Sequence, residues 1–255
     1  MALFRQQHID RVCLSVFILS LALNTLFSYA TNQTIMTDDC HPSADLNQSQ
    51  FIVGYGSLMQ EKSKHEDDSN VGENHPIYIT GLKRGWIKHG PPIGFSTTYL
   101  AVVRQPASKI NAVYFKLNNS KDVNKYDRRE ESYCRVAVSP KQIKTIVNEA
   151  LPEGQYWIYI SSDDKKDHPS SQYPIVQSYV DIFLSGCFEL EEKYHLHGFA
   201  RDCIKMTSDW SEYWVNDRVH PRTAFDNDPD VPKIDPLIAT ELPHYFNQIK
   251  IEGST

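Results

Sequence analysis

The sequence has little of what marks fibrous, disordered or nucleic-acid-binding proteins. Glycine and proline number only 11 and 14 among 255 residues, which excludes collagen-like and low-complexity chains. Acidic residues outnumber basic ones by 32 to 26, and no basic stripe occurs, so the charge gives no reason to expect nucleic acid as a partner. The most apolar segment, Val12–Leu23, is shorter than the roughly 20 residues that a bilayer-spanning helix needs. We therefore expect an ordinary globular fold.

The N-terminal segment, residues 1–30, is typical of a secretory signal peptide. Arg5 and Arg11 supply positive charge around the start of the apolar run, and the run ends in Ser-Tyr-Ala, with small residues where signal peptidase cleaves. We predict cleavage after Ala30 and a secreted or periplasmic protein without stable membrane insertion after cleavage. The alternative is an uncleaved signal anchor, because two more apolar residues lengthen the run.

Behind this segment we expect a polar leader, residues 31–50, and a single folded domain, residues 51–255, with a C-terminal extension from about residue 207. Cleavage removes one of the five cysteines and leaves an even number, which permits two disulfides in an exported protein. Three pairings are possible, and nothing in the sequence chooses among them. The four remaining residues are Cys40, Cys134, Cys187 and Cys203.

Hydrophobic periodicity predicts an α+β fold in which strands come first and helices follow and flank them. The segments with strand-like alternation are Phe51–Gly54, Ile77–Ile87, Thr98–Arg104, Ile110–Leu117, Tyr133–Val138 and Gln155–Ile160. Those with helical spacing are Asp122–Glu131, Pro140–Leu151, Pro174–Glu192, Tyr194–Met206 and Leu237–Phe246. We expect a mostly antiparallel sheet, with a hairpin turn at Gln105-Pro106.

The first segment that could carry chemistry is Gly54-Tyr55-Gly56-Ser57-Leu58, directly after a predicted strand. Two glycines one residue apart let the backbone turn sharply and approach a ligand closely. Successive exposed N–H groups in such a loop can hold a carboxylate. The alternative is a tight turn with no ligand.

The second segment is Tyr126-Asp127-Arg128-Arg129-Glu130, followed by Tyr133 and Arg135. Glu130 could point into a pocket as a general base. The spacing of Asp127 and Glu130 also fits a capping box, in which both carboxylates bond the first turn of a helix and Glu130 is structural.

Taken together, the two segments resemble the gamma-glutamylcyclotransferase superfamily. The resemblance lies in the GYGSL loop and, about seventy residues later, the D-x-R-E-x-x-Y-x-R segment that runs into a strand. Leu100–Leu117 is similar to the central strands of that family, and Tyr179 stands seven residues before Gly186-Cys187 as in its tyrosine helix. The resemblance covers most of residues 51–187.

The resemblance implies a small, mostly antiparallel β-barrel flanked by helices, with a pocket at one end. It also implies a cofactor-free lyase or transferase reaction: a γ-glutamyl group cyclises to 5-oxoproline and releases an amine or amino acid. Glu130 would be the general acid and base. The residues implied to bind the substrate are Gly54, Tyr55, Gly56, Ser57, Leu58, Met59 and Tyr179. Met59-Gln60 stands where the glutathione-specific branch has an aromatic residue, so the identity of the small γ-glutamyl substrate stays open.

Three other interpretations compete with this one. The first is a family-like domain that is catalytically silent and only binds a γ-glutamyl ligand or a protein partner. The second is a metal site at His195 and His197, against which stands their spacing, because two helical residues two positions apart face different directions. The third is a serine hydrolase built on Ser57, whose surroundings lack the G-x-S-x-G pattern. We expect no metal.

Overall fold

The computed structural model describes residues 40–91, 96–161, 166–223 and 230–252. Met1–Asp39 and Cys40–Thr255 form separate units, and only residues of the second are described. The predicted signal peptide, its apolar run and most of the predicted polar leader therefore lie outside the described residues. Within those residues, no helix combines the length and the apolar character that crossing a membrane requires.

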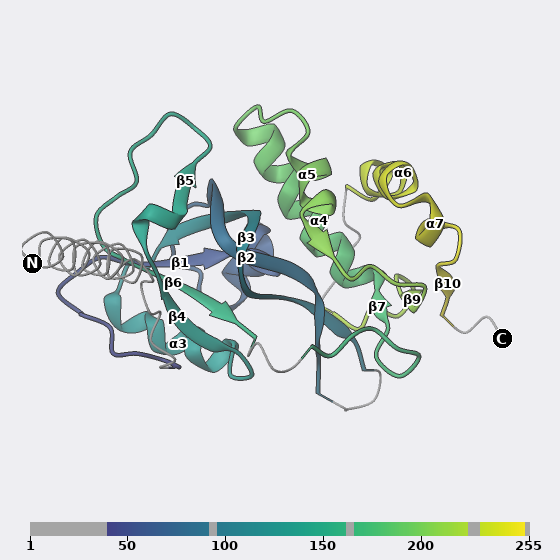
Figure 1. Cartoon of the computed structure of the whole chain (residues 1–255), viewed down its shortest axis with the longest axis horizontal. Helices are drawn as coiled ribbons and strands as arrows, with labels where there is room; N and C mark the ends of the chain where they lie inside the picture. Colours follow the sequence, from purple (N-terminus) through teal and green to yellow (C-terminus); the bar gives the residue numbers. More distant parts are fainter. Residues whose placement is uncertain (1–39, 92–95, 162–165, 224–229, 253–255) are drawn as a thin grey trace, which may run out of the picture. The chain divides into compact units, whose positions relative to one another are not determined.

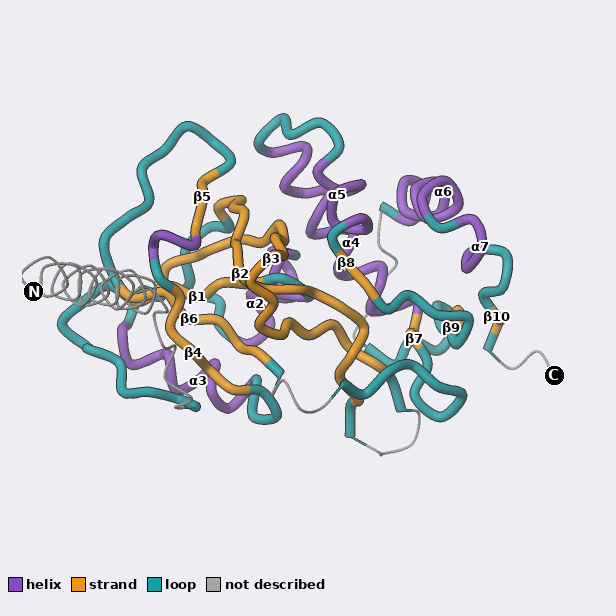
Figure 2. Tube along the Cα trace, in the orientation of Figure 1, coloured by secondary structure: helices purple, strands orange, loops and turns teal. Residues whose placement is uncertain are grey.

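The described chain is an α+β fold in which a curled, mainly antiparallel sheet is flanked by helices (Figures 1 and 2). The strands of the large sheet are β1 (Gln50–Gly54), β2 (His75–His89), β3 (Thr98–Lys116), β4 (Cys134–Val138), β5 (Ile143–Thr145), β6 (Gln155–Ile160) and β8 (Thr207–Ser208). A small second sheet contains β7 (Ile175–Val176), β9 (Trp214–Asn216) and β10 (Lys250–Ile251).

Helices fill the connections and cover the sheet. The α-helices are α2 (Glu61–Asp67), α3 (Val123–Arg129), α4 (Gln177–Lys193), α5 (Phe199–Lys205), α6 (Val231–Glu241) and α7 (Pro243–Phe246). The 3₁₀ turns are η1 (Ser57–Met59), η2 (Ser120–Asp122) and η3 (Pro140–Gln142). The predicted fold class is confirmed.

The large sheet is a half-barrel rather than a closed barrel. Its order is β4-β6-β1-β3-β2-β5, with β8 paired to β2, so the described path has two ends at β4 and β5. β1 pairs parallel with β6 and antiparallel with β3, which places it in the interior of the sheet. All five residues of β1 are buried, as expected for a strand covered on both faces.

The two faces of the sheet contribute to two cores. Phe51 and Val53 lie in a cluster formed by residues of the sheet and its neighbouring loops, while Ile52 lies in the cluster that the sheet shares with α4. From α4, Val180 and Phe183 are fully buried in that shared cluster. Truncating a side chain such as Phe183 to alanine typically costs about 3–5 kcal/mol. Packing against the sheet therefore holds α4 in place.

The predicted hairpin at Gln105-Pro106 is wrong, because β3 runs through this segment without reversing. Thr80 of β2 lies opposite Lys109, whereas Leu82 lies opposite Arg104, so residues 105–108 form a bulge within one long strand. Pro106 is tolerated in this bulge because the extra residues of a bulge are not paired with the neighbouring strand, so a missing N–H group costs no hydrogen bond there.

The helix predicted over Pro140–Leu151 is also wrong. Pro140–Gln142 makes a single 3₁₀ turn with a capping box at Ser139, and the chain then continues as β5. β5 pairs with β2, so Ile143 lies opposite Ile79 and Thr145 opposite Ile77. A short apolar segment fits both the helical period and the strand period. Here the segment forms a strand because it can pair with the edge of β2. The helix predicted over Tyr194–Met206 begins only at Phe199.

The described cysteines form two disulfides, Cys40–Cys134 and Cys187–Cys203. The first ties the segment before β1 to the start of β4. A backbone hydrogen bond also holds this segment to β4: the His41 N–H donates to the Arg135 carbonyl oxygen over 3.0 Å. The second disulfide joins α4 to α5.

Candidate active site

The loop after β1 bends sharply where its two glycines pass close to neighbouring atoms. A Cβ atom on Gly54 would lie 2.7 Å from the Leu58 Cβ, and one on Gly56 would lie 2.9 Å from the Tyr179 hydroxyl oxygen. Real Cβ atoms essentially never approach this closely. Gly54 therefore has no room for a side chain, whereas a side chain at Gly56 would have to displace the Tyr179 hydroxyl. η1 begins directly afterwards at Ser57, and the first N–H groups of such a turn have no acceptor within it.

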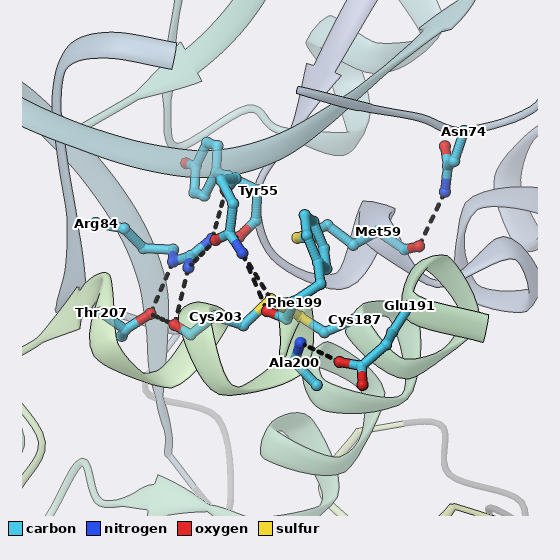
Figure 3. Close-up of a disulfide and its surroundings, with 11 residues drawn as sticks. Tyr55, Met59, Asn74, Arg84, Cys187, Glu191, Phe199, Ala200, Cys203 and Thr207 are labelled. Carbon is cyan, nitrogen blue, oxygen red and sulfur yellow. Dashed lines mark hydrogen bonds between the residues drawn. A yellow bond between two sulfur atoms is a disulfide. The ribbon is translucent and has the colours of Figure 1, made fainter. Parts of the chain in front are cut away.

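Arg84, on β2, supports this loop from beneath (Figure 3). Its Nη1 donates to the Tyr55 carbonyl oxygen over 3.1 Å, and its Nε donates to the Thr207 hydroxyl over 2.8 Å. The remaining donors reach Asn111 and the Cys203 carbonyl, so all five N–H groups of the side chain are hydrogen-bonded. Arg84 is fully buried, and burial lowers its pKa to about 9. A buried guanidinium whose N–H groups are all hydrogen-bonded therefore holds the backbone of the loop at Tyr55.

Glu130 caps the C-terminal end of α3 and has no part in a capping box. α3 begins at Val123, so Asp127 lies inside the helix rather than at its N-cap. The Asp127 carboxylate instead accepts hydrogen bonds from Arg135 Nε and from the Tyr159 hydroxyl, each over 2.8 Å. The capping box predicted as the alternative for Asp127 and Glu130 is therefore wrong.

Glu130 and the glycine loop line one small cavity of about 40 Å³. Its walls come from β1 and the following loop, from β3 and β6, from the α3–β4 connection and from α4. The lining residues are Val53, Gly54, Tyr55, Gly56, Ser57, Leu58, Leu100, Glu130, Tyr133, Tyr159 and Tyr179. Seven of the eight residues singled out in the sequence thus meet at one place, although more than 120 positions separate the first from the last.

Met59 is the eighth, and it does not line the cavity. Its side chain is fully buried in the core shared with α4. Its carbonyl oxygen accepts a hydrogen bond from the Asn74 side chain over 2.9 Å (Figure 3). A Cβ on Gly186 would lie 2.5 Å from the Met59 carbonyl carbon, so α4 packs against the backbone here. Met59 therefore anchors the loop from the core side, and the structure does not bring it together with the other seven residues.

Four of the described tyrosines surround the Glu130 carboxylate. Burial first, and then the Glu130 charge, raises the pKa values of Tyr55 and Tyr179 above their ordinary value. Burial likewise raises the pKa values of Tyr133 and Tyr159, and Glu130 adds to the effect in both. These hydroxyls are therefore protonated at neutral pH and can act as hydrogen-bond donors.

The four hydroxyls differ in what they contact. Tyr55 donates to the Tyr159 carbonyl oxygen over 2.6 Å, and Tyr133 donates to the Leu100 carbonyl oxygen over 3.1 Å. Tyr159 donates to Asp127, as described above. The Tyr179 hydroxyl faces Ser57, whose backbone and side chain partly offset the rise in its pKa by hydrogen bonding. Tyr179 thus places a phenol against the glycine loop itself.

Arg129, the last residue of α3, is a site residue that sequence reasoning missed. Its Nε lies 3.2 Å from Glu130 Oε1, and its Nη2 lies 3.5 Å from the Ser57 hydroxyl oxygen. Tyr133 and Tyr159 were missed too. Tyr133 was visible as part of the second motif, but nothing local distinguishes Tyr159 from the other aromatic residues of β6.

The alternative chemistries find less support in the described part of the chain. Cys187 and Cys203 are bonded to each other, and the described residues contain no group of three His, Cys, Asp or Glu side chains that could hold a metal ion. His195 lies in the loop after α4, and His197 lines a different surface hollow. No histidine is among the described residues lining the cavity beside Ser57.

Comparison with known proteins finds distant neighbours among solved structures and no match by sequence. No known family profile matches the chain. No curated protein sequence matches it either. An uncharacterised human protein of known structure has a TM-score of 0.49 and 13% identity, over 75% of this chain and 98% of that one. A gamma-glutamyl cyclotransferase has a TM-score of 0.49 and 12% identity, over 76% of this chain and 99% of that one. A glutathione-specific gamma-glutamyl cyclotransferase from yeast has a TM-score of 0.38 and 11% identity, over 62% of this chain and 97% of that one. These values assign no activity to this chain.

Proposed function

We propose that this protein is a γ-glutamyl cyclotransferase that uses Glu130 as its general acid and base. The observation that carries the proposal is the convergence of the glycine loop, Glu130 and Tyr179 on a single cavity. Such a site can hold a small substrate between a carboxylate, backbone N–H groups and phenol donors. Attack of an amine on a carbonyl carbon within the same molecule needs these groups and no cofactor.

Glu130 moves the proton in this mechanism. The substrate's α-ammonium group gives a proton to the Glu130 carboxylate, and the freed amine attacks its own δ-carbonyl carbon. A C–N bond forms within the new five-membered ring, and the C–N bond to the leaving group breaks. Glu130 returns this proton to the departing nitrogen. It then takes the second proton that the ring nitrogen must lose to become an amide, and passes it to the released amine, which leaves as an ammonium ion. The products are 5-oxoproline and the released amine or amino acid.

The glycine loop orients the substrate and stabilises the charge that develops during the reaction. N–H groups at Ser57 and Leu58 are suited to hold the α-carboxylate or the carbonyl oxygen. Tyr179 is suited to donate a hydrogen bond at the same place. Holding the γ-glutamyl chain folded back lowers the barrier further, because it removes the entropy cost of ring closure from the chemical step.

A second candidate function is binding without turnover, in which the same cavity holds a γ-glutamyl ligand or part of a protein partner. What favours it is the set of lining residues, because a carboxylate beside a glycine loop and tyrosines can hold a γ-glutamyl group whether or not the group reacts. The two candidates make opposite predictions for product formation.

The test uses the disulfide-bonded protein secreted from its full-length chain. It is incubated with γ-glutamyl amino acids, γ-glutamyl amines and γ-glutamyl peptides, and 5-oxoproline is measured by mass spectrometry. Release from at least one substrate supports the enzyme. Saturable binding by calorimetry with no release from any substrate supports the binding protein and overturns the proposed reaction.

We further propose that the protein is exported and acts on γ-glutamyl compounds outside the cytosol. The support is the predicted signal peptide together with the two disulfides. Disulfides persist in oxidising compartments and are rare in the reducing cytosol. N-terminal sequencing of the secreted protein should begin at Thr31. Retention of residues 1–30 in a membrane fraction would instead indicate a signal anchor.

A further inference from the structure

Arg129 occupies a position between the two halves of the proposed site. Its Nη1 donates to the Ser63 carbonyl oxygen of α2 over 3.3 Å, in addition to its contacts with Glu130 Oε1 and the Ser57 hydroxyl. One guanidinium therefore connects α2, the start of η1 and the glutamate at the end of α3. The Arg129 and Glu130 side chains are 17% and 19% exposed, so both are largely removed from water.

Four tyrosines among the described residues also face Glu130, and their hydroxyls are uncharged at neutral pH. They are Tyr55 from the glycine loop, Tyr133 from the α3–β4 connection, Tyr159 from β6 and Tyr179 from α4, each with a raised pKa. Burial among phenols disfavours a charged carboxylate, whereas a guanidinium at hydrogen-bond distance favours it. Arg129 is thus placed to oppose the effect of burial on the group that must accept a proton.

We propose that Arg129 is a positioning residue that fixes one carboxylate oxygen of Glu130 and keeps this glutamate ionised, ready to accept the substrate's proton. This inference rests on the proposed function for its catalytic meaning, but its physical content can be measured without turnover. The guanidinium N–H at Nε lies 3.2 Å from Oε1 and so fixes the orientation of the carboxylate. Its reach to Ser57 keeps the glutamate in register with the loop that would bind the substrate.

The experiment compares Arg129→Gln with Arg129→Lys and with the control Arg128→Gln, all in the full chain. Arg128 is the adjacent arginine, and its side chain is exposed. Arg128→Gln therefore removes the same charge from the same end of α3 without removing a contact with Glu130 Oε1. The titration of the Glu130 carboxyl carbon is followed by NMR in protein labelled at glutamate, and it is assigned with Glu130→Gln. Circular dichroism and thermal melts show whether each variant is folded.

We expect Arg129→Gln to raise the pKa of Glu130 by about one unit or more relative to the wild-type protein, because it removes an opposite charge at contact distance. Arg129→Lys should keep most of the wild-type value, and Arg128→Gln should leave it unchanged. A purely structural role would lower the melting temperature without moving this titration. An unchanged Glu130 titration in folded Arg129→Gln overturns the inference.

The pH–rate profile gives the catalytic readout and separates the two proposals. The acidic limb of kcat/KM should move to higher pH in Arg129→Gln by the same amount as the NMR titration, and Arg129→Lys should restore it. Absence of 5-oxoproline release from the wild-type protein would overturn the proposed function, yet the NMR comparison would still decide whether Arg129 controls Glu130. A shifted titration with an unshifted acidic limb would overturn the assignment of Glu130 as the base.

Discussion

The cavity end of the molecule and its C-terminal part are both built around buried charges, but the charges are held differently. At the cavity, Glu130 lies among tyrosines and beside a partly exposed arginine. In the C-terminal part, the buried Asp181 carboxylate on α4 is bonded by Arg218 Nε over 2.7 Å and Nη2 over 2.8 Å, and Arg218 also bonds Asp235 of α6. The first arrangement leaves a carboxylate beside an open space, and the second leaves none.

The two regions differ in the role that we propose for them: the cavity end carries the proposed reaction, and the C-terminal part stabilises the fold. The C-terminal part joins the rest of the fold at several points: β8 pairs with β2, and β9 pairs with β7. Asp217 accepts hydrogen bonds from the Ser178 N–H and hydroxyl, 2.8 and 2.7 Å long, at the start of α4. The residues beyond about 207 therefore fix α4, the helix whose Tyr179 reaches the cavity. Substitutions in the two regions should affect different measurements.

The largest expected effect is on turnover at the cavity. Glu130→Gln keeps the size of the side chain but removes the proton acceptor, so 5-oxoproline release should fall by about 10²–10⁴-fold. The melting temperature should change little. Glu131→Gln, at the neighbouring exposed position, is the matched control and should retain full activity. Equal rates for Glu130→Gln and wild type would remove Glu130 from the mechanism.

The next effect is on stability in the C-terminal part. Arg218→Met leaves the Asp181 carboxylate buried without its ion pair and should lower the free energy of unfolding by about 3 kcal/mol. Turnover per folded molecule should stay within about twofold. The exposed Arg201 offers the control. Its partner Glu241 also contacts Lys205, so Arg201→Met should change stability by about 0.5 kcal/mol or less. A loss of turnover as large as that of Glu130→Gln would place this cluster in the active site.

The same variant should show a distinctive pH dependence. Burial raises the pKa of Asp181, and Arg218 opposes that rise. Without Arg218, the folded-state pKa of Asp181 rises further above its unfolded value, so the folded protein gains stability as pH falls and loses it as pH rises. Urea unfolding should therefore show a smaller deficit for Arg218→Met near pH 4 than near pH 7. A deficit that is the same at both pH values would contradict burial of an unpaired carboxylate.

The smallest effect tests the fit between the glycine loop and α4. Gly56→Ala places a Cβ 2.9 Å from the Tyr179 hydroxyl oxygen, and the next neighbour, Leu100, is 3.8 Å away. We expect a destabilisation of about 1 kcal/mol and slower turnover. Tyr179→Phe removes the clashing oxygen, so adding Gly56→Ala to it should cost almost nothing in stability. Additive costs in this double-mutant cycle would show that the two residues do not touch.

Much of the cavity end was predictable because its signals are local. Gly54, Gly56 and Glu130 stand in short motifs whose chemistry is visible from neighbouring residues, and the strand before the loop is a plain apolar run. Arg84 was not predictable, since its partners lie up to 119 positions away along the chain. The Asp127–Arg135 pair spans only eight positions but depends on how the chain turns from α3 into β4, which periodicity does not reveal. Met59 was misplaced because a motif gives the order of residues but not which side of a turn faces the core.

The C-terminal part was predicted only as an extension with a final helix over Leu237–Phe246. α6 begins at Val231 and continues through Pro236, a residue that normally ends a helix, so sequence placed its start too late. β8 and β9 are two and three residues long and exist because partner strands are present. Such elements carry no periodicity of their own. The buried ion pairs that hold them depend on tertiary contacts, which periodicity does not reveal.

The most direct test of the account is the fate of oxygen during turnover in water enriched in ¹⁸O. Intramolecular attack by the substrate's own amine breaks the γ-glutamyl bond without water, so the account predicts 5-oxoproline that carries no ¹⁸O label and no free glutamate. The measurement is mass spectrometry of the products formed by the wild-type protein, with Glu130→Gln as the inactive control. Glutamate labelled with ¹⁸O at its side-chain carboxylate would contradict cyclisation and identify a hydrolase instead.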